Sequence, residues 1–116
     1  MTRELRRARR RQAPEAIMVT DAMTGEVVGR VGNLSETGML MMSSTELVED
    51  ALYQFRFTLT GAMGGEQTLE LGAHLLWSDR ASAPGQAWTG FRFIGLSQEQ
   101  GRQLRRWVDA PDSRYV

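Results

Sequence analysis

The chain has 116 residues, of which 41% are hydrophobic and 24% are charged, so its size and composition are those of one globular domain with a modest core. It has no cysteine and a single histidine, His74, which excludes disulfides and thiolate metal sites and argues against a histidine-based metal centre. No apolar run is long enough to span a membrane, and no hydrophobic stretch follows the basic N-terminus as it would in a secretory signal, so we expect a cytoplasmic protein.

The basic residues are unevenly distributed. The net charge is zero, but residues 1–11 carry six arginines and one glutamate, a net charge of +5, and the rest of the chain carries −5. All 14 basic residues are arginines, whose planar guanidinium can grip a phosphate or a guanine edge with two hydrogen bonds and can stack on flat rings. We therefore expect residues 1–12 to form a flexible arginine-rich arm that binds an anion.

Six strands are predicted after the arm, from alternating or apolar runs separated by turn formers. They span residues 15–21, 26–32, 39–42, 51–60, 67–78 and 87–94. In the fifth strand Trp77 shares a face with Leu71 and Leu75. This alternation favours a core position for Trp77 over a role as a stacking platform for a guanine base.

A helix is predicted from residue 97 onward. Ser97 and Gln100 fit a capping box, and Leu104, Trp107 and Val108 then recur at helical spacing on one face. Many short strands followed by one helix predict an all-β fold: a six-stranded antiparallel Greek-key-like β-barrel with a C-terminal α-helix and an arginine-rich N-terminal arm. We expect the arm at 1–12, the barrel with its closing helix at 13–110 and a tail at 111–116, which frays from Asp112 onward.

Residues suited to catalysis are scarce. The only histidine, His74, lies in the middle of a predicted strand and is expected to be structural or solvated. The acidic residues form no close pair suited to acid–base chemistry, and the glycine-rich loop at 61–65 lacks the Lys and Ser/Thr that a phosphate-binding loop requires. We therefore expect a binding protein with no catalytic residues, metal or cofactor, and not an enzyme.

Two short motifs carry the functional signal. The arm has the sequence RRARR at residues 6–10, an RRxxR and hence an RxxxR pattern, which by itself also fits a solvated charge run. Residues 33–38 have the sequence NLSETG, an NxSxxG pattern that by itself also fits a turn between strands. Together, and in this order, the two motifs resemble RxxxR and (D/N)xSxxG of the PilZ domain family. The strand at 88–94 and the helix from 97 are similar to the last strand and closing helix of that family.

The resemblance implies a barrel that binds the bacterial second messenger cyclic di-GMP. It implies that Arg6 and Arg10 clamp guanine and phosphate, with Arg7 beside them. Arg7 and Arg11 also form an RxxxR pair, so the register of the motif stays open, as does the number of ligand molecules bound.

The barrel side of the site is implied to be the second motif. Its Asn and Ser would contact a guanine edge, and its glycine would allow a positive φ or a close approach of the ligand. The candidate ligand-binding residues are Arg6, Arg7, Arg10, Asn33, Ser35 and Gly38.

The resemblance further implies a receptor or adaptor that relays cyclic di-GMP to an unidentified partner protein controlling motility, biofilm formation or related behaviour. An alternative is a PilZ-type protein–protein interaction module that works without the ligand. A third hypothesis, nucleic-acid binding by the arm, predicts affinity that falls steeply with salt, and the acidic remainder of the chain argues against it.

Overall fold

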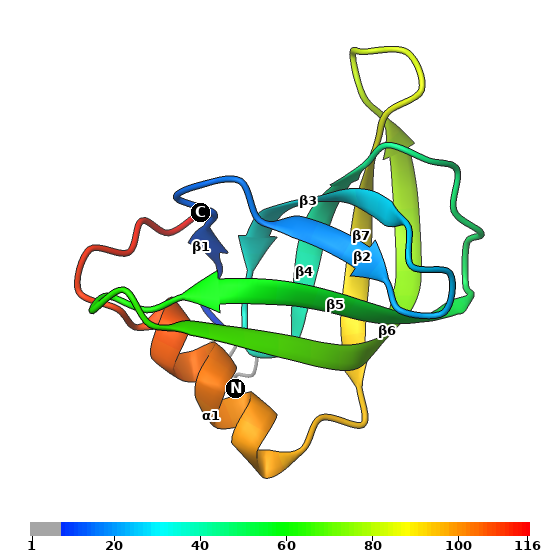
Figure 1. The fold of residues 1–116 in the computed structure, drawn as a ribbon. Coiled ribbons are helices and arrows are strands. Elements are labelled where there is room, and N and C mark those ends of the chain that lie inside the picture. Colours follow the sequence, from blue (N-terminus) through cyan, green and yellow to red (C-terminus); the bar gives the residue numbers. More distant parts are fainter. Residues whose placement is uncertain (1–7) are drawn as a thin grey trace, which may run out of the picture.

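The computed structural model describes residues 8–116 and shows a β-barrel with a helix at one end (Figure 1). Its elements are β1 (Arg11–Gln12), β2 (Met18–Asp21), β3 (Val27–Leu34), β4 (Gly38–Ser43), β5 (Leu52–Thr60), β6 (Glu66–Arg80), β7 (Ala87–Ile94) and α1 (Gln98–Val108). The all-β fold with a C-terminal helix confirms the predicted fold class, and β2 to β7 correspond to the six predicted strands. Residues 1–7, which include most of the predicted arm, lie outside the described residues.

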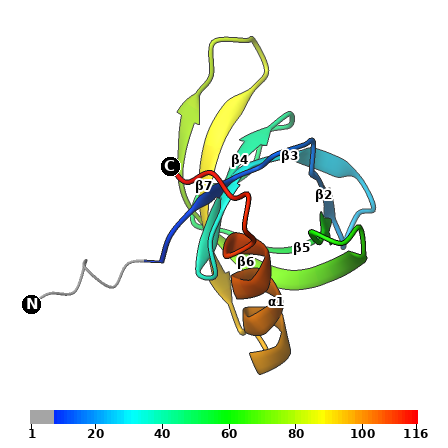
Figure 2. The ribbon, with the colours of Figure 1, turned by 90° about the vertical axis from the view of Figure 1, so that its left-hand side faces the viewer.

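The strands form one antiparallel sheet that closes on itself. Neighbours follow the order β1-β3-β2-β5-β6-β7-β4, and the pairing of β3 with β4 completes a six-stranded barrel of β2 to β7. β1 is an additional strand, too short to show alternation in the sequence, and it pairs with the end of β3. In Figure 2 the barrel is seen from one end, with α1 lying across the lower part of the opening.

The inward faces of the strands fill the barrel. Alternation in β5 buries Phe55, Phe57 and Leu59, as its sequence pattern predicted. Phe55 and Phe91 meet edge to face with 5.1 Å between ring centroids. Burying one such side chain contributes roughly 2 kcal/mol. Because a slip of one residue would turn these side chains toward water, the core also fixes which residues face outward.

Helix α1 covers the end of the barrel. Ser97 Oγ accepts a hydrogen bond from the N–H of Gln100 (3.0 Å), and the N–H of Ser97 donates to Gln100 Oε1 (3.1 Å), which confirms the predicted capping box. Leu104, Trp107 and Val108 are buried, as their spacing predicted. Among residues 8–116, no helix is long and apolar enough to cross a membrane.

The tail beyond α1 was expected to fray, and this expectation is wrong. Arg11 and Tyr115 form an antiparallel bridge, flanked by backbone hydrogen bonds of 2.8 and 3.0 Å between residues 10–12 and 114–116. The Tyr115 hydroxyl also donates to the carbonyl of Val108 at the end of α1 (2.8 Å). The tail is therefore held between β1 and the helix.

Candidate functional site

A bulge in β3 determines where Asn33 points. β3 and β4 pair regularly up to Val31, and the register then shifts at Gly32, so that Asn33 lies opposite Leu40. An extra residue in one strand exchanges inside and outside for the residues that follow it. Val31 and Leu34 are consequently both in the core, whereas Asn33 points to the outer side of the barrel, where it is covered by its neighbours and only 7% exposed.

Arg10 meets Asn33 on this outer face. Arg10 Nη1 donates a hydrogen bond to Asn33 Oδ1 at 3.0 Å, across 23 residues of sequence. The alternation of an extended chain explains this contact, because Arg11 points inward and its neighbours Arg10 and Gln12 therefore point outward. Gln12 is itself the strand partner of Asn33. The two sequence motifs thus come together at this hydrogen bond.

Arg11 has a different environment from Arg10. Its side chain is buried, its guanidinium carbon lies 4.3 Å from the centre of the Trp107 ring, and its Nη1 donates to the carbonyl of Trp107 at 2.8 Å. The last carbonyls of a helix lack partners within the helix, and a cation there also interacts favourably with the helix dipole. Arg11 therefore caps α1 and joins it to β1.

Arg9 contacts the tail. Its guanidinium carbon lies 4.4 Å from the centre of the Tyr115 ring, and it forms an ion pair with Asp109, which follows α1. Arg9 and Arg11 therefore hold the arm to the helix and tail, on either side of Arg10. The other two candidate arginines, Arg6 and Arg7, lie outside the described residues.

Ser35 holds the turn between β3 and β4. Its side chain is fully buried, and its Oγ accepts hydrogen bonds from the N–H groups of Thr37 (3.1 Å) and Gly38 (3.2 Å). A backbone bond from the N–H of Ser35 to the carbonyl of Gly38 (2.9 Å) closes the turn. The hydroxyl of Ser35 is therefore directed at the backbone of its own turn, which fixes the position of the strand end that carries Asn33.

Gly38 is required by packing between strands. A Cβ built at this position would lie 2.2 Å from the carbonyl oxygen of Phe91 on β7, far inside contact distance. Gly38 does not have a positive φ, unlike four other glycines of residues 8–116, so the first of its two expected roles is wrong, and a close approach of the ligand stays a prediction. The close approach of β7 accounts for this glycine without a ligand.

A second bulge corrects the prediction for Trp77. β6 and β7 shift register at Leu76, so that Trp77 lies opposite Gly90 and its side chain is 45% exposed instead of buried in the core. The indole packs closely against β7 at Gly90, since a Cβ on Gly90 would be 2.3 Å from Trp77 Nε1. The alternation of β6 predicted the wrong face because a bulge is not visible in a hydrophobic pattern.

The two bulges place Asn33 and Trp77 in one row across four strands. Asn33 pairs with Leu40, Leu40 with Gly90, and Gly90 with Trp77. The row is polar at the Asn33 end, where Arg10 adds a cation, and aromatic at the Trp77 end. Such an outer surface suits a flat, polar, anionic ligand.

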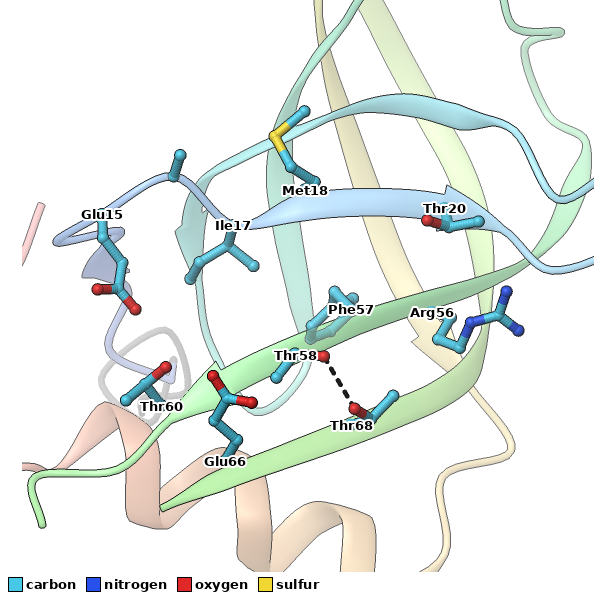
Figure 3. A pocket seen from close by; sticks show the side chains of 11 residues that line it. Glu15, Ile17, Met18, Thr20, Arg56, Phe57, Thr58, Thr60, Glu66 and Thr68 are labelled. Atoms are coloured by element: carbon cyan, nitrogen blue, oxygen red, sulfur yellow. Dashed lines mark hydrogen bonds between the residues drawn. The ribbon is translucent and has the colours of Figure 1, made fainter. Parts of the chain in front are cut away.

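Other polar features lie away from this row. His74 Nε2 is 2.6 Å from Asp50 Oδ1, so the histidine is hydrogen-bonded at the surface as expected of a structural residue. A groove of about 490 Å³ opens between β2 and β5 (Figure 3), where Ile17 and Phe57 line the floor beside the hydrogen-bonded pair Thr58 and Thr68. Of the candidate ligand-binding residues that the structure describes, none lines this groove.

Comparison with known proteins points to one family. The sequence model of the PilZ domain family matches residues 4–110. The structure is similar to the PilZ domain of YcgR from Escherichia coli, solved with c-di-GMP, at 24% identity and a TM-score of 0.64, covering 87% of this chain and 86% of that one. It is also similar to a crystal structure of YcgR from Escherichia coli in complex with c-di-GMP, at 25% identity and a TM-score of 0.66, covering 85% of this chain and 42% of that one.

A third similar structure is the Bacillus subtilis inhibitor of motility MotI/DgrA, at 11% identity and a TM-score of 0.70. The alignment covers 90% of this chain and 48% of that one. This likeness concerns the fold. No curated protein sequence matches the chain.

Proposed function

The chain belongs to the PilZ domain family, and from this membership we propose that it binds cyclic di-GMP on the outer face of the barrel around Asn33. The observation that supports this most directly is the hydrogen bond between Arg10 and Asn33, which is partly buried and joins the two family motifs on the outer side of the barrel. Two structurally similar proteins, both forms of Escherichia coli YcgR, were solved with c-di-GMP.

The chemistry of the pair fits a guanine dinucleotide. The guanidinium of Arg10 presents its N–H donors in a planar fork that suits guanine O6 and N7 or a phosphate. The Asn33 side chain, whose Oδ1 accepts from Arg10, adds an amide N–H donor for a base edge. We propose Arg6 and Arg7 as further contacts on the strength of the motif, and Ser35 and Gly38 as the residues that shape the turn.

The environment of Arg11 favours one register of the RxxxR motif. Arg11 is buried and engaged with Trp107, so a ligand on the outer face would have to compete with the barrel end for its side chain. Arg10 already faces outward next to Asn33. This supports a clamp of Arg6 and Arg10 over one of Arg7 and Arg11.

Trp77 extends the proposed site. It lies in the same row as Asn33, and Leu40 and Gly90 lie between the two residues. Its indole packs on Gly90 and is half exposed. An exposed indole offers a flat face on which a purine can stack, a contact worth about 1–3 kcal/mol per base. We propose that one guanine of the ligand stacks on Trp77, while the rest of the dinucleotide lies toward Arg10.

The proposal also includes a role in signalling. Family membership supports a receptor or adaptor that passes the cyclic di-GMP signal to a partner protein controlling motility, biofilm formation or related behaviour. The ligand-independent interaction module is the alternative, and it predicts no heat of binding.

Isothermal titration tests the proposal directly. Cyclic di-GMP should bind the full chain, and cyclic di-AMP should bind far more weakly, because adenine presents an N6 donor where guanine presents the O6 acceptor that an arginine needs. Equal binding of the two dinucleotides would show that the arm recognises only charge. No binding of either would favour the alternative.

A further inference from the structure

β6 continues beyond the part that β5 covers. The β5–β6 pairing ends at Leu52 and His74, and one further pair of backbone hydrogen bonds joins Leu75 to residues 50 and 51. Within residues 8–116, residues 77–80 then pair only with β7. Figure 1 shows this part of the β6–β7 hairpin rising out of the barrel.

The hydrogen-bond pattern of the hairpin identifies which groups lie on the open edge. The N–H of Ala81 donates to the carbonyl of Gln86 on the β7 side (3.0 Å). In an antiparallel pair, residues facing the partner alternate with residues facing away. Asp79 therefore bonds with β7, whereas Ser78 and Arg80 direct their N–H and C=O groups away from it. Within residues 8–116, no backbone group outside this hairpin forms a hydrogen bond with the backbone of Ser78 or Arg80.

The two edge residues, Ser78 and Arg80, also line a groove of about 1010 Å³. One wall is the β6–β7 hairpin with Ser78 and Arg80, and the other is the loop between β4 and β5 with Glu46 and Glu49. Both glutamates are exposed, and neither forms an ion pair within the part of the chain that the structure describes. The groove therefore combines unpaired strand groups with an acidic opposite wall.

We propose that this groove binds an extended, basic segment of a partner protein, which adds a strand to the edge of β6 at Ser78 and Arg80. Main-chain hydrogen bonds to the edge would hold the segment, and its basic side chains would face Glu46 and Glu49. The inference is independent of the nucleotide, because none of these residues belongs to the candidate ligand-binding set.

Two other arrangements fit the structure less well. Pairing of two copies that uses Ser78 and Arg80 of both would put Asp79 directly opposite Asp79 of the second copy, and like charges opposite each other are destabilising. β5 also has an open edge near Thr58, but Ile17 already points into that gap toward Phe57 (Figure 3), and Ile17 is buried.

The test uses a short fluorescent peptide of alternating lysine and valine, with glutamate replacing lysine in the control peptide. Fluorescence anisotropy measures binding to the full chain, and amide hydrogen exchange maps the site. Proline at position 80 removes an edge N–H that β7 does not use, so Arg80→Pro should weaken binding of the lysine peptide by about tenfold or more. Arg80→Ala keeps the N–H and removes the cation, so it should bind at least as tightly as the native chain.

Several results decide the matter. Slowed exchange at Ser78 and Arg80 in the native chain supports the proposal even if Arg80→Pro does not fold. Glu46→Gln with Glu49→Gln should weaken the lysine peptide and not the glutamate peptide. Equal affinity of Arg80→Pro and Arg80→Ala, protection near Thr58 instead, or protection without peptide in a concentration-dependent dimer would overturn it.

Discussion

The guanidinium of Arg10 and the carboxamide of Asn33 are joined by a hydrogen bond of 3.0 Å on the outer face of the barrel. The bond depends on two separate features of the backbone. The bulge at Gly32 turns Asn33 outward, and the inward anchoring of Arg11 turns Arg10 outward. The Arg10–Asn33 pair therefore forms only where β1 meets β3, because the arm supplies one partner and the end of β3 supplies the other.

Arg10 is expected to carry a large part of the affinity for cyclic di-GMP. A hydrogen bond to a charged group contributes about 1.5–3 kcal/mol, so Arg10→Ala should weaken binding between about tenfold and about a hundredfold. Isothermal titration measures the change. Arg56→Ala is a matched control, since Arg56 lies on β5 in an exposed ion pair with Glu70 and should leave the affinity unchanged. Equal losses in both variants would mean that only the total charge matters.

Arg11 is expected to act on stability. Arg11→Ala removes the stacking on Trp107 and the bond to its carbonyl, which together should lower the free energy of unfolding by about 3 kcal/mol in urea denaturation. Arg11→Lys keeps the charge without the planar stack, so its free energy of unfolding should lie between those of the native chain and Arg11→Ala. If Arg11→Ala instead abolished cyclic di-GMP binding with stability unchanged, the Arg7 and Arg11 register would be the correct one.

Gly38→Ala is expected to disturb the pairing of β4 with β7. The new methyl group would lie 2.2 Å from a backbone oxygen of Phe91 that cannot rotate away, so the strands must separate locally. We expect a loss of at least about 2 kcal/mol in the free energy of unfolding. Gly65→Ala is the control, because a Cβ there meets nothing within 4 Å and should change stability by no more than about 0.5 kcal/mol. Similar melting temperatures for the two variants would contradict this packing argument.

Trp77→Ala is expected to affect binding more than folding. The indole is half exposed, so its loss should cost only about 1 kcal/mol of stability, whereas loss of base stacking should weaken cyclic di-GMP binding by about tenfold. Titration of Trp fluorescence gives a second readout, because a stacked guanine should quench Trp77. The neighbouring Leu76→Ala removes a similarly exposed apolar side chain outside the row and should keep full affinity.

The hydrophobic pattern predicted the parts of the fold that follow a regular period. β5 alternates without interruption, and its inward residues are those that the pattern indicated. The capping box of Ser97 and Gln100 likewise fixed the start of α1 from local chemistry alone. These elements have the local sequence signals that their structures require.

The remaining features depend on long-range contacts. A bulge changes the outward face without changing the composition of a strand, so Trp77 was assigned to the core, although the glycine at 32 was a signal for the bulge in β3. Arg11 looks like its charged neighbours in the sequence, and only the approach of Trp107, 96 residues away, distinguishes it. The order of the tail arises from β1 in the same way.

The backbone N–H of Val116 donates to the carbonyl of Arg10 at 3.0 Å, and this contact has a practical consequence. A fluorescent reporter or affinity tag attached after Val116 would begin next to the proposed ligand clamp, because Val116 is hydrogen-bonded to Arg10. Such a fusion would sense rearrangement of the arm, and it would also disturb binding measurements. Labels for nucleotide titrations are better placed in the exposed loop between β6 and β7, which lines the proposed peptide groove and holds none of the candidate nucleotide-binding residues.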